Sequence, residues 1–317
     1  MRNRFVLLFL MIAFLFGCVN QPNNKQTITI ATLKGPSAMG MIRMIDSLAN
    51  APNADIKVKI LNEPIQVRKM VIDGSADFAI LPTTMAAILY NKGLDYKLMA
   101  IPVWGTLYLF GSDTTISIWN DLKGKTINVM AKGMTPDVLF CYLLSANGIN
   151  PNKDVTLDYS FPTHIDLANA VAAEQASLGV ISEPLVSMVI QRNPSVAPIF
   201  DLNSEWQKIQ SVPIAQTALI VKSSLVENNA DLAGKVASSY CYSSQWVNAN
   251  PDSAAALIVK YGILPNAEVA MNAIPRSNLK YVDAKAITDD VNRYLKVFYQ
   301  MNADIIGGKL PDENFVY

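Results

Sequence analysis

The segment TITIATL at residues 27–33, which the breaker GPS at residues 35–37 follows, decides the fold class of this chain. Threonine and apolar residues alternate in it, which is typical of a β-strand, and glycine and proline end the strand. Residues 39–48 then carry apolar side chains at helical spacing. A strand, a short turn and a helix together form the repeating unit of a parallel sheet that is covered by helices.

The strand–helix unit recurs along most of the chain. In the first part, we predict further strands at 55–61 and 77–81 and helices at 65–72 and 85–90. A second series follows, with predicted strands at 126–130, 155–159 and 177–181 and helices at 136–147, 165–174 and 184–191. Strand-like runs also occupy 97–110 and 215–221, and the remainder is expected to be helical at 230–248, 253–261 and 283–301.

The two series predict an α/β protein of two lobes. We expect residues 27–111 and 213–317 to form lobe 1 and residues 112–212 to form lobe 2. Two connecting segments, near residues 110–116 and 212–219, would then form a two-segment hinge.

Composition excludes several classes of protein. The 317 residues are 51% hydrophobic and 16% charged, with a formal net charge of zero. A nucleic-acid-binding protein needs a basic face, and a disordered chain has few apolar residues, so neither class fits. His164 is the only histidine in the sequence, which excludes a metal site of two imidazoles and weakens the case for histidine-based catalysis.

The first residues are typical of a secretory signal peptide. Arg2 and Arg4 precede the apolar stretch 5–16, which is too short to span a bilayer. The sequence LFGC at residues 15–18 resembles the lipobox of bacterial lipoproteins, although Phe16 replaces the usual small residue. We therefore expect cleavage after residue 17, a diacylated Cys18 and a lipidated tether at 18–26. The alternative is an ordinary signal peptide followed by a chance cysteine.

Two further cysteines, Cys141 and Cys241, lie in predicted helices among apolar neighbours. An exported protein could pair them in a disulfide. Their surroundings favour two buried free thiols instead.

Five predicted strands end in a short glycine-, proline- or threonine-containing segment before a helix. In open α/β sheets such helix starts gather at the carboxyl ends of the strands, where ligands bind. Serine or threonine is expected to cap each helix there and to present hydroxyl and N–H groups to a ligand. The candidate ligand-binding residues are Lys34, Gly35, Pro36, Ser37, Met39, Pro82, Thr83, Thr84, Trp104, Gly105, Lys132, Gly133, Met134, Thr135, Thr163, His164 and Glu183.

Some of these candidates have a second interpretation. Trp104 and Tyr108 lie where the lobes should join, and they could pack in the hinge or stack on a flat ligand. His164 is expected to pack at a helix start rather than act as a base. The sequence contains no nucleotide P-loop, Rossmann fingerprint, zinc-ligand spacing or nucleophile elbow, so we expect no cofactor and no metal ion.

Several motifs resemble one bacterial transport family. They are DLKGKT at 121–126, TPD at 135–137, NGINPNKDV at 147–155, GSAD at 74–77, LP at 81–82, LYNKG at 89–93, EP at 183–184 and the ending IGGKLP at 306–311 with Phe315 and Tyr317. This pattern is similar to the nitrate/sulfonate/taurine and thiamine-precursor family of ABC-transporter substrate-binding proteins. The resemblance implies a type II periplasmic-binding fold with a ligand between its lobes.

The same resemblance implies a function. We expect a monomeric lipoprotein, exported and anchored at the cell envelope, that delivers a small heterocyclic nutrient or organic anion to an ABC permease. It would not be an enzyme. Two alternatives remain open: an enzyme similar to thiamine-pyrimidine synthases, which a single histidine and a signal peptide disfavour, and a ligand-sensing lipoprotein that works with a receptor.

Overall fold

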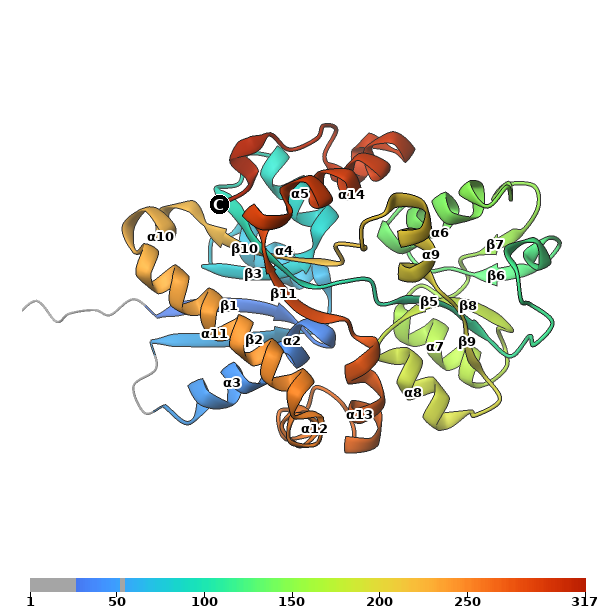
Figure 1. The fold of residues 1–317 in the computed structure, drawn as a ribbon, viewed down its shortest axis with the longest axis horizontal. Helices are drawn as coiled ribbons and strands as arrows, with labels where there is room; N and C mark the ends of the chain where they lie inside the picture. The colour runs from blue at the N-terminus through green and yellow to red at the C-terminus, as the bar shows by residue number, and fades with distance from the viewer. Residues whose placement is uncertain (1–26, 52–54) are drawn as a thin grey trace, which may run out of the picture.

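The computed structural model describes residues 27–51 and 55–317, which form two α/β lobes side by side (Figure 1). The predicted signal peptide, tether and Cys18 lie outside the described residues. The type II binding fold predicted from the sequence is confirmed, because each lobe contains a mixed sheet covered by helices.

Lobe 1 is built on a sheet with the strand order β11-β4-β10-β3-β1-β2 in the described part of the chain. β1 pairs in parallel with β2 and β3, whereas β10 runs antiparallel to β3 and β4. The strands are β1 (Ile28–Leu33), β2 (Ile56–Leu61), β3 (Phe78–Pro82), β4 (Tyr96–Val103), β10 (Thr217–Lys222) and β11 (Leu279–Asp283). The last of these was not predicted, because its five residues lie in a stretch dominated by helices.

Lobe 2 is built on a sheet with the order β7-β6-β8-β5-β9 among the described residues. Its strands are β5 (Leu107–Gly111), β6 (Thr126–Asn128), β7 (Thr156–Asp158), β8 (Leu178–Ser182) and β9 (Ala197–Asp201). Because β5 pairs with β8 and β9, the segment 107–111 belongs to lobe 2, and the expected lobe boundary at residue 111 is wrong. The chain crosses between the lobes at 104–106 and again at 211–216.

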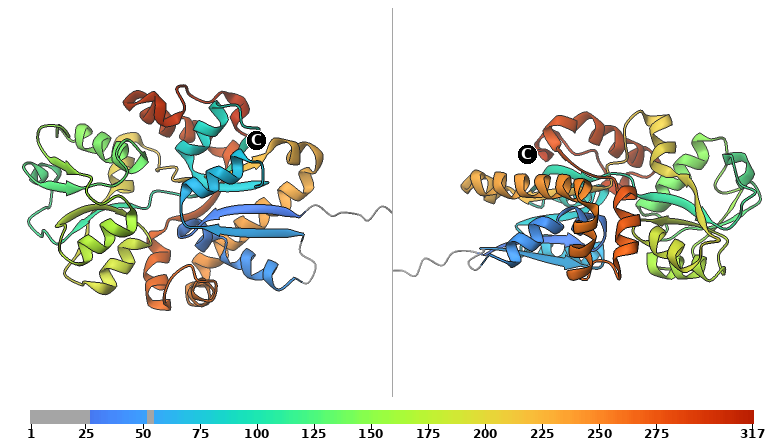
Figure 2. Two further views of the ribbon diagram at one scale, coloured as in Figure 1. Left: turned by 180° about the vertical axis from the view of Figure 1, so that it is seen from behind. Right: turned by 60° about the horizontal axis from the view of Figure 1, so that its bottom comes forward.

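Helices cover both faces of the lobe 1 sheet (Figure 2). Side chains alternate between the faces: Ile30 packs with α2, α3 and α11–α13, whereas Ala31 packs with α4, α5 and α14. The helices of the chain are α2 (Pro36–Gly40), α3 (Ile42–Ala49), α4 (Pro64–Ile72), α5 (Thr83–Asn91), α6 (Thr135–Ala146), α7 (His164–Ala172), α8 (Leu185–Arg192), α9 (Leu202–Gln210), α10 (Ser223–Asn228), α11 (Ala230–Ala249), α12 (Pro251–Lys260), α13 (Ala267–Arg276) and α14 (Thr288–Met301). Among the described residues, no helix is both long and apolar enough to cross a membrane.

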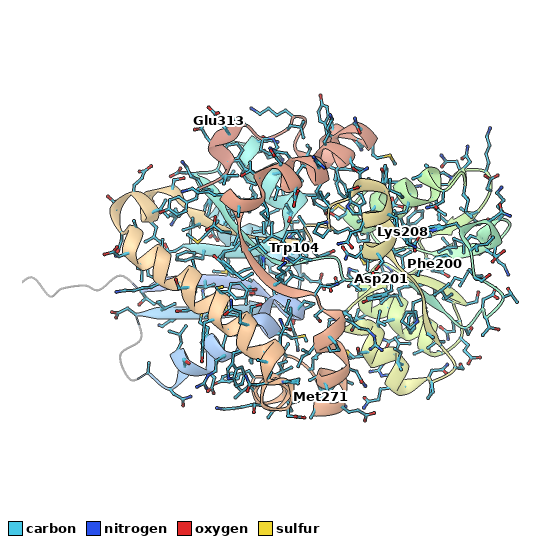
Figure 3. The ribbon with its side chains drawn as sticks, viewed as in Figure 1. Trp104, Phe200, Asp201, Lys208, Met271 and Glu313 are labelled. Carbon is cyan, nitrogen blue, oxygen red and sulfur yellow. The ribbon has the colours of Figure 1, made fainter. Side chains whose placement is uncertain are left out.

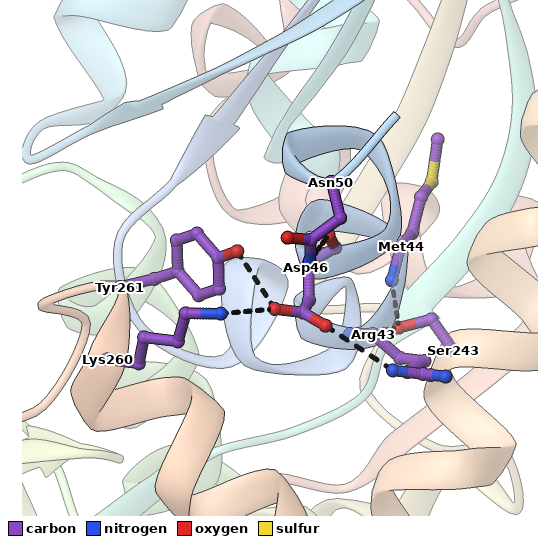
Figure 4. Close-up of polar contacts among 7 residues, drawn as sticks. All are labelled: Arg43, Met44, Asp46, Asn50, Ser243, Lys260 and Tyr261. Atoms are coloured by element: carbon purple, nitrogen blue, oxygen red, sulfur yellow. Dashed lines mark hydrogen bonds and ion pairs between the residues drawn. The ribbon is translucent and has the colours of Figure 1, made fainter. Parts of the chain in front are cut away.

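A polar cluster joins three helices on the outer side of lobe 1 (Figure 4). Asp46 on α3 accepts hydrogen bonds from the Lys260 ammonium at 2.8 Å and the Tyr261 hydroxyl at 2.9 Å. These two bonds, Lys260 first, keep the pKa of Asp46 below its usual range. The Ser243 hydroxyl on α11 accepts a hydrogen bond from the backbone N–H of Arg43 at 3.0 Å. The cluster fixes α3 and α12 against α11, and α11 in turn carries Tyr240, whose hydroxyl bonds to the Ser37 carbonyl of α2.

Candidate functional site

The loops after β1 and β3 in lobe 1 meet the loops after β6 and β8 in lobe 2. Two direct contacts join them. In the first, the Thr84 and Thr135 hydroxyl oxygens lie 2.7 Å apart in a hydrogen bond between the first turns of α5 and α6. Both side chains are buried. The sequence placed both residues in the site, and the structure brings them together.

The second contact joins Gly35 and Pro184. Gly35 has φ 111°, a conformation that favours glycine, and a Cβ atom there would lie 3.3 Å from Cδ of Pro184. The loop after β1 therefore packs tightly against the loop after β8. Loops from the two lobes are therefore in direct contact, and the structure represents a closed arrangement of the lobes.

The expected serine and threonine caps are wrong at four of the five helix starts. Gly35, Pro82, Met134 and Pro184 occupy the N-cap positions of α2, α5, α6 and α8, and none of them makes a side-chain cap. Only Thr163 caps its helix, by accepting a bond from the Asp166 N–H at 3.1 Å. The hydroxyls of the first turns of α5 and α6 are thereby left free for other partners.

Polar atoms without a protein partner gather where β3 ends and β10 begins. In the described part of the chain, the Thr83 and Thr217 hydroxyls and the Gln216 side-chain oxygen are buried without a hydrogen bond. Thr217 pairs with Pro82 across the sheet, and the Gln216 backbone carbonyl accepts a bond from the Thr83 N–H at 3.3 Å, so the three residues are neighbours. Thr32, on the neighbouring strand β1, also carries a buried hydroxyl without a partner. Buried groups of this kind require a partner such as water or a ligand.

Sequence reasoning identified Thr83 but missed Thr32, Gln216 and Thr217. Gln216 and Thr217 could have been found from their place in the sequence. They lie where the second crossing re-enters lobe 1 at the start of β10, and β10 pairs with β3, the strand that precedes Thr83.

Glu183 is buried at the end of β8. Its carboxylate accepts bonds from the Ser187 hydroxyl at 3.0 Å and the Ser187 N–H at 3.2 Å. Arg276 of lobe 1 lies 3.9 Å away. Burial raises the pKa of Glu183 to about 7, and Ser187 and Arg276 oppose the rise. Sequence reasoning missed Arg276, because nothing in the pattern at the end of α13 indicates where the helix points.

The loop before α6 is organised by a buried carboxylate. Asp137 accepts bonds from the Gly133 N–H and the Tyr159 hydroxyl, both at 2.7 Å. Burial, followed by the bond to Asp137, raises the pKa of Tyr159. Lys132 lies over the Tyr159 ring at 5.2 Å from its centroid, and Met134 is exposed. Lys132 and Met134 therefore lie at the surface of this loop.

Several predicted residues lie away from the contact between the lobes or have another role. Met39 is fully buried in a hydrophobic core of lobe 1. Ser37 is buried, and its carbonyl accepts a bond from the Tyr240 hydroxyl at 2.9 Å. Lys34 is exposed. His164 is half-buried, and desolvation of the ring lowers its pKa to about 4, so the imidazole is neutral. Neutral His164 with a buried, unpartnered Nδ1 fits packing at a helix start.

Trp104, which Figure 3 labels, and Gly105 lie in the first crossing between the lobes. The Trp104 indole N–H donates to the Lys280 carbonyl at 2.8 Å, and a Cβ at Gly105 would lie 2.5 Å from Asn203. Trp104, Asn203 and Asn278 line a cavity of about 550 Å³ beside the hinge. Of the two interpretations of Trp104, the structure supports hinge packing.

The two described cysteines are free thiols in different lobes. They are half-buried rather than fully buried, which corrects the expectation for Cys141 and Cys241. Among the described residues, no group of histidine, cysteine or acidic side chains could hold a metal ion.

The chain is similar to solved structures of ABC-transporter binding proteins. The structure of an ABC transporter from Parabacteroides distasonis is 26% identical to this chain, covers 92% of it and 99% of its own length, and superimposes with a TM-score of 0.79. The periplasmic aliphatic sulphonate binding protein SsuA from Escherichia coli is 16% identical, with 92% and 90% coverage and a TM-score of 0.71. This second likeness shows the fold.

A relative among curated sequences is YtlA of Bacillus subtilis, whose name is "Putative binding protein YtlA". It is 27% identical over 143 residues, which are 45% of this chain and 41% of YtlA. The matched region thus spans about two fifths of that relative. A model of the family described as "ABC transporter, phosphonate, periplasmic substrate-binding protein" matches residues 38–235, which is more than half of the chain. The chain therefore belongs to this family of periplasmic substrate-binding proteins of ABC transporters.

Proposed function

We propose that this protein is a lipid-anchored solute-binding protein that captures a small organic anion between its lobes and delivers it to an ABC permease. The observation that carries the proposal is the group of buried, unpartnered polar atoms of Thr83, Gln216 and Thr217 beside the interlobe bond of Thr84 and Thr135. A ligand at this edge of the sheet would satisfy these atoms and contact both lobes.

The chemistry of this region favours an anion. Thr83 and Thr84 form the first turn of α5, whose N-terminus carries a partial positive charge. Lys34 and Lys132 add positive charge from opposite lobes. Asp137 and Glu183 are buried carboxylates that already accept hydrogen bonds within the protein. The donors that remain for a ligand at the lobe boundary are therefore hydroxyl groups, the N–H groups at the start of α5 and the two lysine ammonium groups, a set that suits an anion.

Other members of the group narrow the class of ligand. The family description names phosphonates, and SsuA is described as binding aliphatic sulphonates. Both ligand classes pair an anionic, oxygen-rich head with a carbon chain, as a small organic anion does. We therefore rank alkylphosphonates and alkylsulfonates above a heterocyclic vitamin precursor.

The ligand test combines identification with one substitution. Mass spectrometry of material that denatured protein releases gives the native ligand, and calorimetry then compares methylphosphonate, ethanesulfonate, nitrate and a hydroxymethylpyrimidine. Thr83→Val keeps the shape but removes the hydroxyl, so affinity for the bound anion should fall by about tenfold. Thr126→Val, on an exposed strand position, is the matched control. Tight binding of the pyrimidine alone, or an unchanged affinity of Thr83→Val, contradicts the proposal.

The anchor is tested separately. Cys18→Ser removes the proposed site of diacylation, and two acyl chains are what holds such a protein firmly on a membrane. We expect the variant in the soluble fraction and the parent in the membrane fraction. A variant that still sediments with membranes would show that Cys18 carries no lipid, whatever the ligand.

A further inference from the structure

A second contact between the lobes lies outside the binding loops, where α8 of lobe 2 meets α13 of lobe 1 (Figure 1). Ser187 and Gln191 are spaced by four residues on α8, so they share one face of the helix, and Glu183, just before the helix, bonds to Ser187. That face is polar along its length. It points at the α13 side of lobe 1, because each of the three has a partner there or is linked to one.

At the end of this contact nearest the hinge, the Arg276 guanidinium donates to the Ser187 hydroxyl at 3.3 Å, and Ser187 donates to Glu183 at 3.0 Å. The Tyr108 hydroxyl of lobe 2 donates to the Arg276 carbonyl at 3.4 Å. Glu183 also donates its backbone N–H to Thr106 in the first crossing. This part of the contact is therefore continuous with the hinge.

At the outer end, the Gln191 amide donates to the Glu268 carboxylate at 2.8 Å and accepts from the Asn266 amide at 3.0 Å. Between the two ends, Met188 packs against a hydrophobic core of lobe 1. Gln191 and Glu268 are exposed. The contact thus has a buried polar end, an apolar middle and an exposed polar end, all of which join one lobe to the other.

We propose that the contact between α8 and α13 is a latch that holds the two lobes closed without a ligand, with Arg276 and Gln191 as its positioning residues. All of its hydrogen bonds run between protein atoms, so its strength does not depend on what the binding loops hold. For a binding protein that must be closed to hold its ligand, the apparent dissociation constant equals the intrinsic one divided by the fraction of molecules that are closed. The latch therefore sets the affinity of the site without contacting the ligand.

The test uses the exposed end of the latch, because substitutions there leave the buried Glu183 and the half-buried Arg276 intact. Gln191→Glu places a second carboxylate opposite Glu268, and the like charges repel at low ionic strength. Adding Glu268→Gln to this variant restores one carboxylate and one amide in reversed order. Arg192→Ala is the matched control, since Arg192 lies on the same helix but bonds to Asn169 within lobe 2.

Closure is read out by a reporter at the other contact between the lobes. Thr84→Cys with Thr135→Cys forms a disulfide only when the lobes are closed, since the two hydroxyls lie 2.7 Å apart in the closed form. The full chain is freed of copurified ligand, oxidised at low salt, and the 84–135 disulfide is quantified by peptide mapping. Because peptide mapping identifies the 84–135 disulfide by its own linked peptides, the native cysteines need no replacement. Thermal unfolding of each variant is measured in parallel.

We expect Gln191→Glu to slow disulfide formation about fivefold with an unchanged melting temperature. The added Glu268→Gln should restore the rate to within about twofold of the parent, and Arg192→Ala should match the parent. An unchanged rate in Gln191→Glu, or a double variant as slow as the single one, overturns the latch. Neither result depends on the ligand, so the proposed function would stand or fall separately.

Discussion

Glu183 shows at the scale of one residue how burial changes the chemistry of a side chain. Its carboxyl pKa is raised from 4.5 to about 7, mainly by desolvation. The folded protein therefore binds a proton more tightly than the unfolded chain does. The stabilising contribution is present below pH 4.5 and is lost as the pH rises through about 7.

This shift predicts the pH dependence of stability. Between pH 5 and pH 8, the free energy of unfolding of the parent should fall by an amount on the order of 3 kcal/mol from this group. Glu183→Gln carries no charge at either pH, so its unfolding free energy should fall less over the same range. Urea unfolding at the two pH values measures both slopes. Equal slopes would show that Glu183 is ionised or exposed in the native protein.

At the scale of elements, the binding loops depend on helices that lie behind them. α2 has only five residues and no side-chain cap, so it cannot hold its own position. The Tyr240 hydroxyl on α11 bonds to the Ser37 carbonyl of α2, and both groups are buried. The Asp46 cluster fixes α3 and α12 against α11. The long helix thereby supports the loop that contacts Pro184.

This support predicts a measurable cost. Tyr240→Phe leaves the Ser37 carbonyl buried without its donor, which should lower the free energy of unfolding by about 1–2 kcal/mol. Tyr242→Phe, on the exposed side of the same helix, should change it by less than about 0.5 kcal/mol. Chemical denaturation compares the two variants. A Tyr240→Phe cost as small as that of the control would mean that α2 does not depend on this bond.

At the scale of the whole molecule, the chain belongs to a family of periplasmic substrate-binding proteins of ABC transporters, and we propose that its two lobes move relative to each other. The crossings at 104–106 and 211–216 are the covalent links between them. A hydrophobic core also runs through the junction, since Leu98 of lobe 1 and Leu107 of lobe 2 belong to one cluster. A rotation about this junction would separate the loops at Gly35 and Thr84 from those at Pro184 and Thr135.

Ligand binding should therefore change the size of the molecule in solution. Because a ligand that contacts both lobes favours the closed form, the radius of gyration should decrease when the native ligand is added, but only slightly in the parent, which the proposed latch already holds largely closed. The decrease should be larger for Gln191→Glu, which starts from a more open population. Small-angle scattering at saturating ligand measures both. A radius that stays constant in parent and variant alike would exclude a hinge mechanism.

Local pattern alone was sufficient for the fold class and for most elements. The alternation at 27–33 and the helical spacing after it predicted β1, and the same pattern predicted α4, α6 and α7 to within a few residues. It also placed Thr84, Thr135, Gly35 and Glu183 at the boundary of the lobes. These features depend on residues close together in the chain, where hydrophobic periodicity and turn residues act.

Only the tertiary structure decided which elements belong together. β5 belongs to lobe 2 because it pairs with strands about 70 to 90 residues later, and no local signal identifies such partners. The same reason hides Arg276, which reaches Glu183 from a helix 93 residues later in the chain. At the starts of α5 and α6, the Thr84 and Thr135 hydroxyls bond to each other across the lobes instead of capping their helices. Contacts over such distances are selected by packing of the whole chain, and the local sequence does not contain them.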